Sequence, residues 1–134
     1  MFHLGEVMDK NKATNLSAVT LAFVGDAVYS LFVRERLTFT SDFKTGVLSN
    51  LAIKEVRATA QAEFVKKIEH LFTEEELSVY KRAKNTKKRT RSKSASIADY
   101  DMSTGFEAVL GYLYLTGNTK RLNYLLNGGE ENEG

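Results

Sequence analysis

Helical spacing of apolar residues is the feature that most constrains the fold of this chain. Its 134 residues include no proline, and apolar side chains recur every three or four positions instead of alternating with polar ones. Proline ends or kinks helices, and this spacing places apolar side chains along one face of a helix. The pattern predicts an all-α fold that needs no strands.

Two helical regions are predicted in the first half of the chain. Asn15 or Ser17 can cap a helix that runs to about Leu37. Residues 44–72 are expected to be mostly helical, and 51–72 to form one amphipathic helix that faces the core. The apolar side of that helix would consist of Ile53, Val56, Ala60, Phe64, Ile68 and Leu71.

Further helices and a basic segment are predicted in the second half. Thr73 and the three glutamates after it form the capping box of a short helix that ends near Ala83. Residues 81–96 are rich in cations, lack an apolar face and are expected to be a mobile loop. Helical spacing resumes near Ile97, and residues 122–126 make a last short helix.

Length and composition indicate one domain in a reducing compartment. Residues 1–127 are expected to form that domain and residues 128–134 a disordered acidic tail. The absence of cysteine excludes a disulfide framework and favours the cytoplasm. No signal peptide is recognised in residues 1–15, and Asp26 interrupts the apolar stretch 16–33, so no membrane association is expected.

Charge is unevenly distributed along the chain. The net charge is only +2, but eight of the thirteen residues from 81 to 93 are basic, and acids gather at 74–76 and 130–133. Such a dense run of cations predicts a local contact with a polyanion. A solvated charged loop without a ligand is the alternative interpretation.

Two apolar segments each carry a single carboxylate. LAFVGDAVYSLFV, residues 21–33, contains Asp26 directly after Gly25, and FEAVLGYLYL, residues 106–115, contains Glu107. Neither acid has a cation one helical turn away. Because desolvation of an unpaired carboxylate is unfavourable by several kcal/mol, each acid needs a compensating partner or access to solvent.

Three explanations for these acids remain open at the level of sequence. Hydrogen bonds from the backbone or from hydroxyls such as those of Ser103 and Thr104 are one, and helices that are less buried than their composition indicates are another. The third is a divalent metal ion shared by the two helices. Mg²⁺ suits such a site because it takes one or two protein carboxylates and completes its shell with water and substrate phosphates.

Both acidic segments resemble a known family. LAFVGDAVYSLFVRERL resembles the signature helix of the ribonuclease III endonuclease domain, and STGFEAVLGYLYL resembles the second acidic helix of that domain. Between them, VRATAQAEFV, FTEEELSVYKRAKN and the basic segment resemble the short bacterial branch called Mini-ribonuclease III. The resemblance covers nearly the whole chain and implies an all-α endonuclease-domain bundle that is dimeric.

The resemblance also implies a role for each acid. Asp26 matches the aspartate of the GD motif and Glu107 the metal-binding glutamate, so both are expected to be catalytic and to bind Mg²⁺. Full-length ribonuclease III carries two more acids, where this chain has Ala22 and Thr104. Mini-ribonuclease III resembles this chain in that respect, and the number of bound metal ions stays open.

The activity implied by the resemblance is Mg²⁺-dependent endonucleolytic cleavage of double-stranded RNA, leaving 5′-phosphate and 3′-hydroxyl ends. The implied setting is a cytoplasmic homodimer that matures precursor 23S ribosomal RNA, with a large-subunit ribosomal protein as a candidate accessory partner. Val24, Tyr29 and Phe32 are candidate dimer contacts and equally candidate core residues.

The basic segment is expected to bind the RNA, because it directly precedes the helix of Glu107 and can reach phosphates beside the scissile bond. The candidate RNA-binding residues are Lys81, Arg82, Lys84, Asn85, Lys87, Lys88, Arg89, Arg91 and Lys93. Arg82 and Asn85 are the first candidates, since they lie where the chain resembles a KRGRN motif of the family. A non-catalytic RNA-binding adapter and a helical protein–protein module are the competing interpretations.

Overall fold

The computed structural model describes residues 6–40, 44–86 and 96–130, and these residues form an all-α fold, as predicted. The helices in chain order are α1 Lys10–Asn15, α2 Ala18–Thr40, α3 Thr45–Val56, α4 Ala58–Ile68, the 3₁₀ helix η1 Glu69–Leu71, α5 Glu74–Lys84, α6 Ile97–Leu115 and α7 Thr119–Leu126. No helix within the three described ranges is long and apolar enough to cross a membrane.

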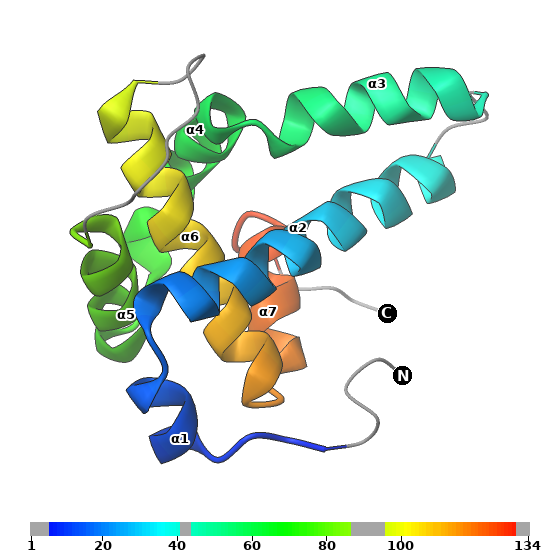
Figure 1. Cartoon of the computed structure of the whole chain (residues 1–134). Helices are drawn as coiled ribbons and strands as arrows, with labels where there is room; N and C mark the ends of the chain where they lie inside the picture. Colours follow the sequence, from blue (N-terminus) through cyan, green and yellow to red (C-terminus); the bar gives the residue numbers. More distant parts are fainter. Residues whose placement is uncertain (1–5, 41–43, 87–95, 131–134) are drawn as a thin grey trace.

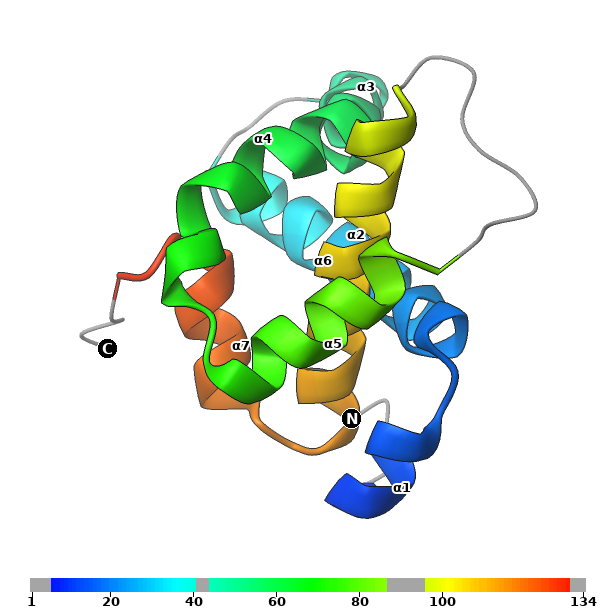
Figure 2. The same ribbon diagram turned by 90° about the vertical axis from the view of Figure 1, so that its left-hand side faces the viewer.

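α6 is the central helix of the fold. It packs against α2, α4 and α5, and α7 folds back beside its C-terminal half (Figures 1 and 2). Every residue from Ser103 to Leu113 is buried except Glu107, which is half-buried. A helix that is apolar all round must be covered on all sides, and the neighbouring helices provide that cover.

Two glycines allow α2 and α6 to touch through their backbones. A Cβ atom on Gly25 would lie 1.6 Å from the carbonyl oxygen of Glu107, and one on Gly111 would lie 2.0 Å from the carbonyl oxygen of Leu21. Both distances are far inside van der Waals contact, so each position accepts only glycine. This crossing places Asp26, the residue after Gly25, beside Glu107.

α2 is buried on one face only. Leu21, Tyr29 and Val33 lie in the core, whereas Phe23 is 78% exposed and Val19 is 51% exposed. This apolar stretch is therefore covered by other helices on one side only. The other side presents large apolar residues to solvent.

Some helix boundaries differ from those predicted. The helix α1 lies in a stretch for which the apolar spacing predicts none, and Asp9 caps it by accepting a hydrogen bond from the Asn11 N–H at 3.1 Å. α2 begins after Ser17, whose hydroxyl accepts from the Thr20 N–H at 3.0 Å. It continues to Thr40, beyond the predicted end near residue 37.

The prediction of one amphipathic helix over residues 51–72 is wrong, because the chain breaks at Arg57. This residue has extended backbone, with φ −62° and ψ 147°, between α3 and α4. Ile53 is consequently 51% exposed, while Phe64 and Ile68 pack into the core. A single extended residue changes the helix direction without interrupting the apolar spacing, so the break leaves no signal in the pattern.

α5 begins with the predicted capping box. The Thr73 hydroxyl accepts from the Glu76 N–H at 3.1 Å, and the Glu76 carboxylate accepts from the Thr73 N–H at 3.0 Å. The helix extends to Lys84, so the first residues of the predicted loop at 81–96 form its last turn. Residues 87–95 and 131–134, which include most of that loop and of the predicted tail, lie outside the described residues.

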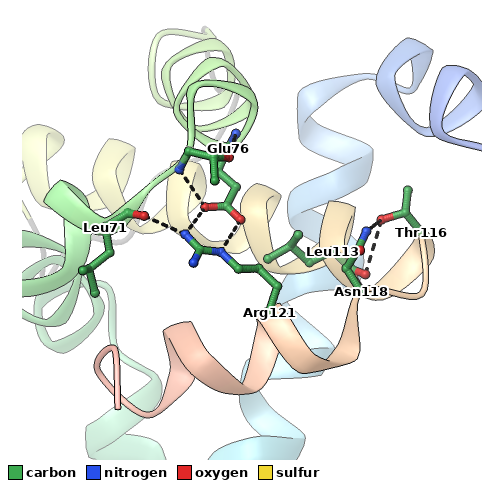
Figure 3. A network of polar contacts seen from close by, with 7 residues as sticks. Leu71, Glu76, Leu113, Thr116, Asn118 and Arg121 are labelled. Atoms are coloured by element: carbon green, nitrogen blue, oxygen red, sulfur yellow. Dashed lines mark hydrogen bonds and ion pairs between the residues drawn. The ribbon is translucent and has the colours of Figure 1, made fainter. Parts of the chain in front are cut away.

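Glu76 is 3% exposed and has a full set of partners (Figure 3). Arg121 of α7 donates from Nε to Oε2 and from Nη2 to Oε1, both at 2.8 Å. Nη2 also donates to the carbonyl oxygen of Leu71 at 2.6 Å. This ion pair connects α7 to the start of α5 and the end of η1.

Candidate active site

Asp26 and Glu107 meet at the crossing of α2 and α6. Asp26 is exposed and Glu107 is half-buried, and their carboxyl groups lie close enough to share a hydrogen bond. The other side chain that contacts the Glu107 carboxyl is the amide of Gln61. The structure thus brings together the two acids that the sequence singled out, about eighty positions apart.

The surroundings of Glu107 disfavour its charged form. Burial is the main cause that raises the pKa of Glu107 to about 9, and the hydrogen bond and charge of Asp26 raise it further, while the Gln61 amide lowers it. Two like charges at close range in a partly desolvated site cannot both be ionised without a counter-charge. The site therefore favours either a proton on Glu107 or a bound cation.

The hydroxyls proposed as partners of these acids are used elsewhere. Ser103 and Thr104 both donate to the carbonyl oxygen of Tyr100, at 2.7 and 3.0 Å. They do not compensate Glu107, so that explanation is wrong. The explanation by exposure holds for Asp26, whose side chain reaches solvent. For Glu107 the structure provides one neutral donor, the Gln61 amide, which only partly offsets its burial.

Gln61 is a residue of the site that the sequence analysis missed. Its Nε2 donates to the Val56 carbonyl oxygen at 2.9 Å and to Glu107 Oε2 at 3.4 Å, and its side chain is 2% exposed. Its Oε1 is buried without a hydrogen-bond partner. The available signal was an amide at helical spacing with Val65 and Ile68, that is, a polar residue on the core face of α4.

The donors at this crossing fit Mg²⁺. They are carboxylate and amide oxygens, the ligands that hard divalent cations prefer. Among the described residues, no three His, Cys, Asp or Glu side chains form a cluster that could hold a metal ion. The candidate carboxylate ligands at this crossing are therefore Asp26 and Glu107. Mg²⁺ typically takes one or two from the protein.

The described part of the basic segment lies at the C-terminal end of α5. Lys81, Arg82 and Asn85 are exposed, and Lys84 is half-buried with its Nζ 5.8 Å from the centre of the Tyr80 ring. The remaining candidate RNA-binding residues lie outside the described residues and are Lys87, Lys88, Arg89, Arg91 and Lys93.

Arg82 makes contacts that its sequence did not indicate. Its Nη1 donates to the Thr14 carbonyl oxygen at 2.8 Å, and its Nη2 to the Leu16 carbonyl oxygen at 3.1 Å. Carbonyls at the end of a helix such as α1 have no partner within that helix. Arg82 thus joins the end of α5 to the connection between α1 and α2.

Comparisons with known proteins identify the family of the chain. Residues 19–118 match the family model described as Ribonuclease III domain. A Mini-ribonuclease 3 of Clostridium tetani is 40% identical over 126 residues, which are 93% of this chain and 83% of the relative. One from Symbiobacterium thermophilum is 44% identical over 111 residues, 83% of this chain and 85% of the relative.

A solved structure is similar as well. The crystal structure of a protein from Fusobacterium nucleatum has a TM-score of 0.76 at 30% identity, and covers 84% of this chain and 90% of its own. The chain belongs to the ribonuclease III family, whose members are endoribonucleases. Within that family its relatives are Mini-ribonuclease 3 proteins, which confirms the branch that the sequence resembles.

Proposed function

We propose that this endoribonuclease cleaves double-stranded RNA in a Mg²⁺-dependent reaction, with Asp26 and Glu107 as its catalytic and metal-binding residues. The observation that carries the proposal is the meeting of these two carboxylates where the backbones of α2 and α6 touch. Metal ligands need placement within about 0.5 Å, and a glycine-packed crossing provides such rigidity. When bound, Mg²⁺ supplies an activated water and stabilises negative charge on the phosphate.

The two carboxylates contribute differently. Asp26 is exposed and is the acid that an approaching phosphate group can reach together with the metal. Glu107 lies deeper in α6 and is held by the Gln61 amide, so it anchors the inner side of the site. The residues of the chain therefore act mainly by position, as is typical of phosphodiester cleavage with a metal ion.

The proposed RNA-binding surface consists of the end of α5 and the segment after it. Lys81 and Asn85 are exposed there, and α5 packs against α6, which carries Glu107. Cations on such a surface neutralise phosphates without reading bases, which suits A-form RNA with its inaccessible major groove. The proposed set remains Lys81, Arg82, Lys84, Asn85, Lys87, Lys88, Arg89, Arg91 and Lys93.

The proposed assembly is a homodimer formed through the exposed face of α2. Phe23 and Val19 lie one turn apart on that face and form an apolar patch near Asp26. Exposed aromatic residues are frequent anchors of interfaces. Tyr29 packs against Phe106 in the core, with ring centroids 5.4 Å apart, so it is less suited to the interface than Phe23. Phe23→Ser is expected to convert a dimer to monomers in analytical ultracentrifugation.

The proposed substrate is precursor 23S ribosomal RNA in the cytoplasm, cut to 5′-phosphate and 3′-hydroxyl ends, with a large-subunit ribosomal protein as an accessory partner. Support for this role is the family membership of the chain. Incubation of the precursor RNA with the purified protein and Mg²⁺, followed by mapping of the ends, tests it. Cleavage that needs an added ribosomal protein would establish the accessory partner.

Cleavage of long duplex RNA tests the reaction itself. We expect the wild-type protein to cut it in Mg²⁺, and Asp26→Asn to reduce the rate by about 10³-fold, because charge stabilisation at the phosphate is lost. Wild-type protein that binds duplex RNA but cuts no faster than Asp26→Asn would be an RNA-binding adapter. Protein that neither cuts nor binds at low salt would be a protein–protein module.

A further inference from the structure

The amide of Gln61 is buried with half of its hydrogen-bonding capacity unused. Its Nε2 has two acceptors, the Val56 carbonyl oxygen at 2.9 Å and Glu107 Oε2 at 3.4 Å, while its Oε1 has none. A buried polar atom without a partner is unfavourable by about 1–3 kcal/mol. The NH₂ end of the amide serves the fold by pairing the Val56 carbonyl at the end of α3, and its second contact is with the Glu107 carboxylate.

The two acceptors determine which end of the amide faces Glu107. The Val56 carbonyl and a carboxylate oxygen of Glu107 need a donor, so the NH₂ end must point to them. A flipped amide would bring its oxygen against both acceptors and lose both hydrogen bonds. Oε1 is consequently left for a donor that the described residues do not supply.

The backbone around Gln61 holds its side chain in place. Its N–H donates to the Arg57 carbonyl oxygen at 2.9 Å in the first turn of α4, immediately after the break between α3 and α4. Val56, the acceptor of Nε2, is the last residue of α3, where helix carbonyls lack partners within the helix. The side chain therefore reaches from the end of α3 to the middle of α6.

We propose that Gln61 is a positioning residue for the metal ion: its Nε2 donates to the Glu107 carboxylate and fixes the orientation in which this carboxylate would bind the ion. This inference rests on the proposed function, because it takes Asp26 and Glu107 as the metal ligands. Groups that orient ligands in this way typically contribute 10- to 100-fold to metal affinity. Neither Ala22, which has no polar side-chain atom, nor Thr104, whose hydroxyl donates to Tyr100, provides this contact.

Direct Mg²⁺ binding by the complete protein, without RNA, tests the inference. Binding is followed by the rise of the melting temperature with Mg²⁺ concentration, since a ligand of the folded state stabilises it by mass action. Gln61→Met keeps the size of the side chain and removes both contacts. Val65→Ala opens a cavity on the same face of α4 and is the control for a loss of packing.

Gln61→Met is expected to raise the Kd for Mg²⁺ at least about tenfold, because the Glu107 carboxylate loses the donor that orients it. Val65→Ala should lower the melting temperature and leave the Kd within about twofold of wild type, because it removes only buried methyl groups. The Mg²⁺ dependence of RNA cleavage should shift with the Kd in Gln61→Met. The KM for RNA at saturating Mg²⁺ should stay constant, because a side chain that is 2% exposed cannot contact RNA.

An unchanged Kd in Gln61→Met would overturn the inference, and so would an equal loss of affinity in Val65→Ala. The proposed function fails separately, if the wild-type protein neither binds Mg²⁺ nor cuts duplex RNA better than Asp26→Asn. If wild type does both and Gln61→Met binds Mg²⁺ as tightly, only the role of Gln61 is lost.

Discussion

Two glutamates lie within this protein in opposite settings. Glu76, at the start of α5, accepts two hydrogen bonds from Arg121 and one from the Thr73 N–H (Figure 3). Glu107, in the middle of α6, faces Asp26 and the Gln61 amide, and its pKa is raised to about 9. A buried carboxylate that is paired with a cation contributes to the stability of the fold. A carboxylate that lies beside another carboxylate lowers the stability of the fold and can instead bind a cationic ligand.

The setting of Glu107 depends most on Gly25. Gly25→Ala is expected to push α2 and α6 apart, because the new Cβ would lie 1.6 Å from the Glu107 carbonyl oxygen. The expected loss is at least about 3 kcal/mol in the free energy of unfolding, measured by urea denaturation. Separation of the helices would also move Asp26 away from Glu107, so duplex cleavage should be lost.

Gly46→Ala is the matched control for this substitution. No atom lies within 4 Å of a Cβ at Gly46, which sits in the first turn of α3. The same change there should be neutral or stabilise the protein by about 0.5–1 kcal/mol, because alanine favours helices. Similar losses at Gly25 and Gly46 would contradict the backbone contact of α2 with α6.

The setting of Glu76 depends on Arg121. Arg121→Met removes the cation and keeps most of the side-chain length, which leaves a buried carboxylate unpaired. We expect a loss of about 3 kcal/mol in the free energy of unfolding. Lys10→Met is the control, because Lys10 pairs with Glu75 at 2.8 Å but the two side chains are 68% and 42% exposed. Lys10→Met should lower the free energy of unfolding by less than about 1 kcal/mol. Equal losses in Lys10→Met and Arg121→Met would contradict the special role of the buried ion pair.

Replacement of glutamate by glutamine should change the melting temperature in opposite directions at Glu76 and Glu107, in metal-free buffer at pH 8. Glu76→Gln weakens the pair with Arg121 and should lower the melting temperature. Glu107→Gln removes a carboxylate that is unfavourably placed, and should raise the melting temperature by roughly 4 °C. The comparison requires a chelator, because bound metal would reverse the second effect. A lower melting temperature for both variants would show that Glu107 is also a structural acid.

The gain in Glu107→Gln should depend on pH. The pKa of Glu107 is about 9 in the folded protein, against an ordinary value of 4.5 for a glutamate. Below the lower pKa both states bind the proton and the charge has no effect on stability. Between the two values the unfolded state loses the proton more readily, so wild-type stability falls as pH rises. Melting temperatures should therefore coincide near pH 4 and diverge up to about pH 9.

Lys81→Ala should have the smallest effect. Lys81 is exposed at the end of α5, so its removal should leave the melting temperature unchanged and weaken binding of duplex RNA a few fold at low salt. The slope of log affinity against log salt concentration should fall by about one. Arg82→Ala should in addition lower the melting temperature, because two backbone carbonyls lose their donor. An unchanged salt slope in Lys81→Ala would exclude this residue from the RNA contact.

Local patterns predicted much of the fold and singled out Asp26 and Glu107, which the structure brings together. The all-α class, the capping box at Thr73 and the start of α2 at Ser17 are confirmed, because helix period and capping involve only residues a few positions apart. The isolated positions of Asp26 and Glu107 in apolar segments marked them as unusual for the same reason. The break at Arg57 was missed, since both helices continue the same apolar spacing.

Patterns in the sequence did not predict which distant residues each side chain contacts. The contact of Arg82 with Thr14 and Leu16 joins residues 66 and 68 positions apart, and Arg121 reaches Glu76 over 45. Gln61 reads as an ordinary polar residue until the break after α3 turns it toward Glu107. Contacts of this kind arise from the packing of helices, which no short-range pattern specifies.

The sequence by itself determined the helices, the two lone acids and the cluster of cations, because helical period, capping and charge are local properties of the chain. Only the tertiary structure decided that Gly25 lies against the backbone of Glu107 and that Asp26 is exposed while Glu107 is half-buried. It also decided that the Gln61 amide donates a hydrogen bond to Glu107. The physical reason is that burial and pairing of a charge depend on which helices cross, and at what distance.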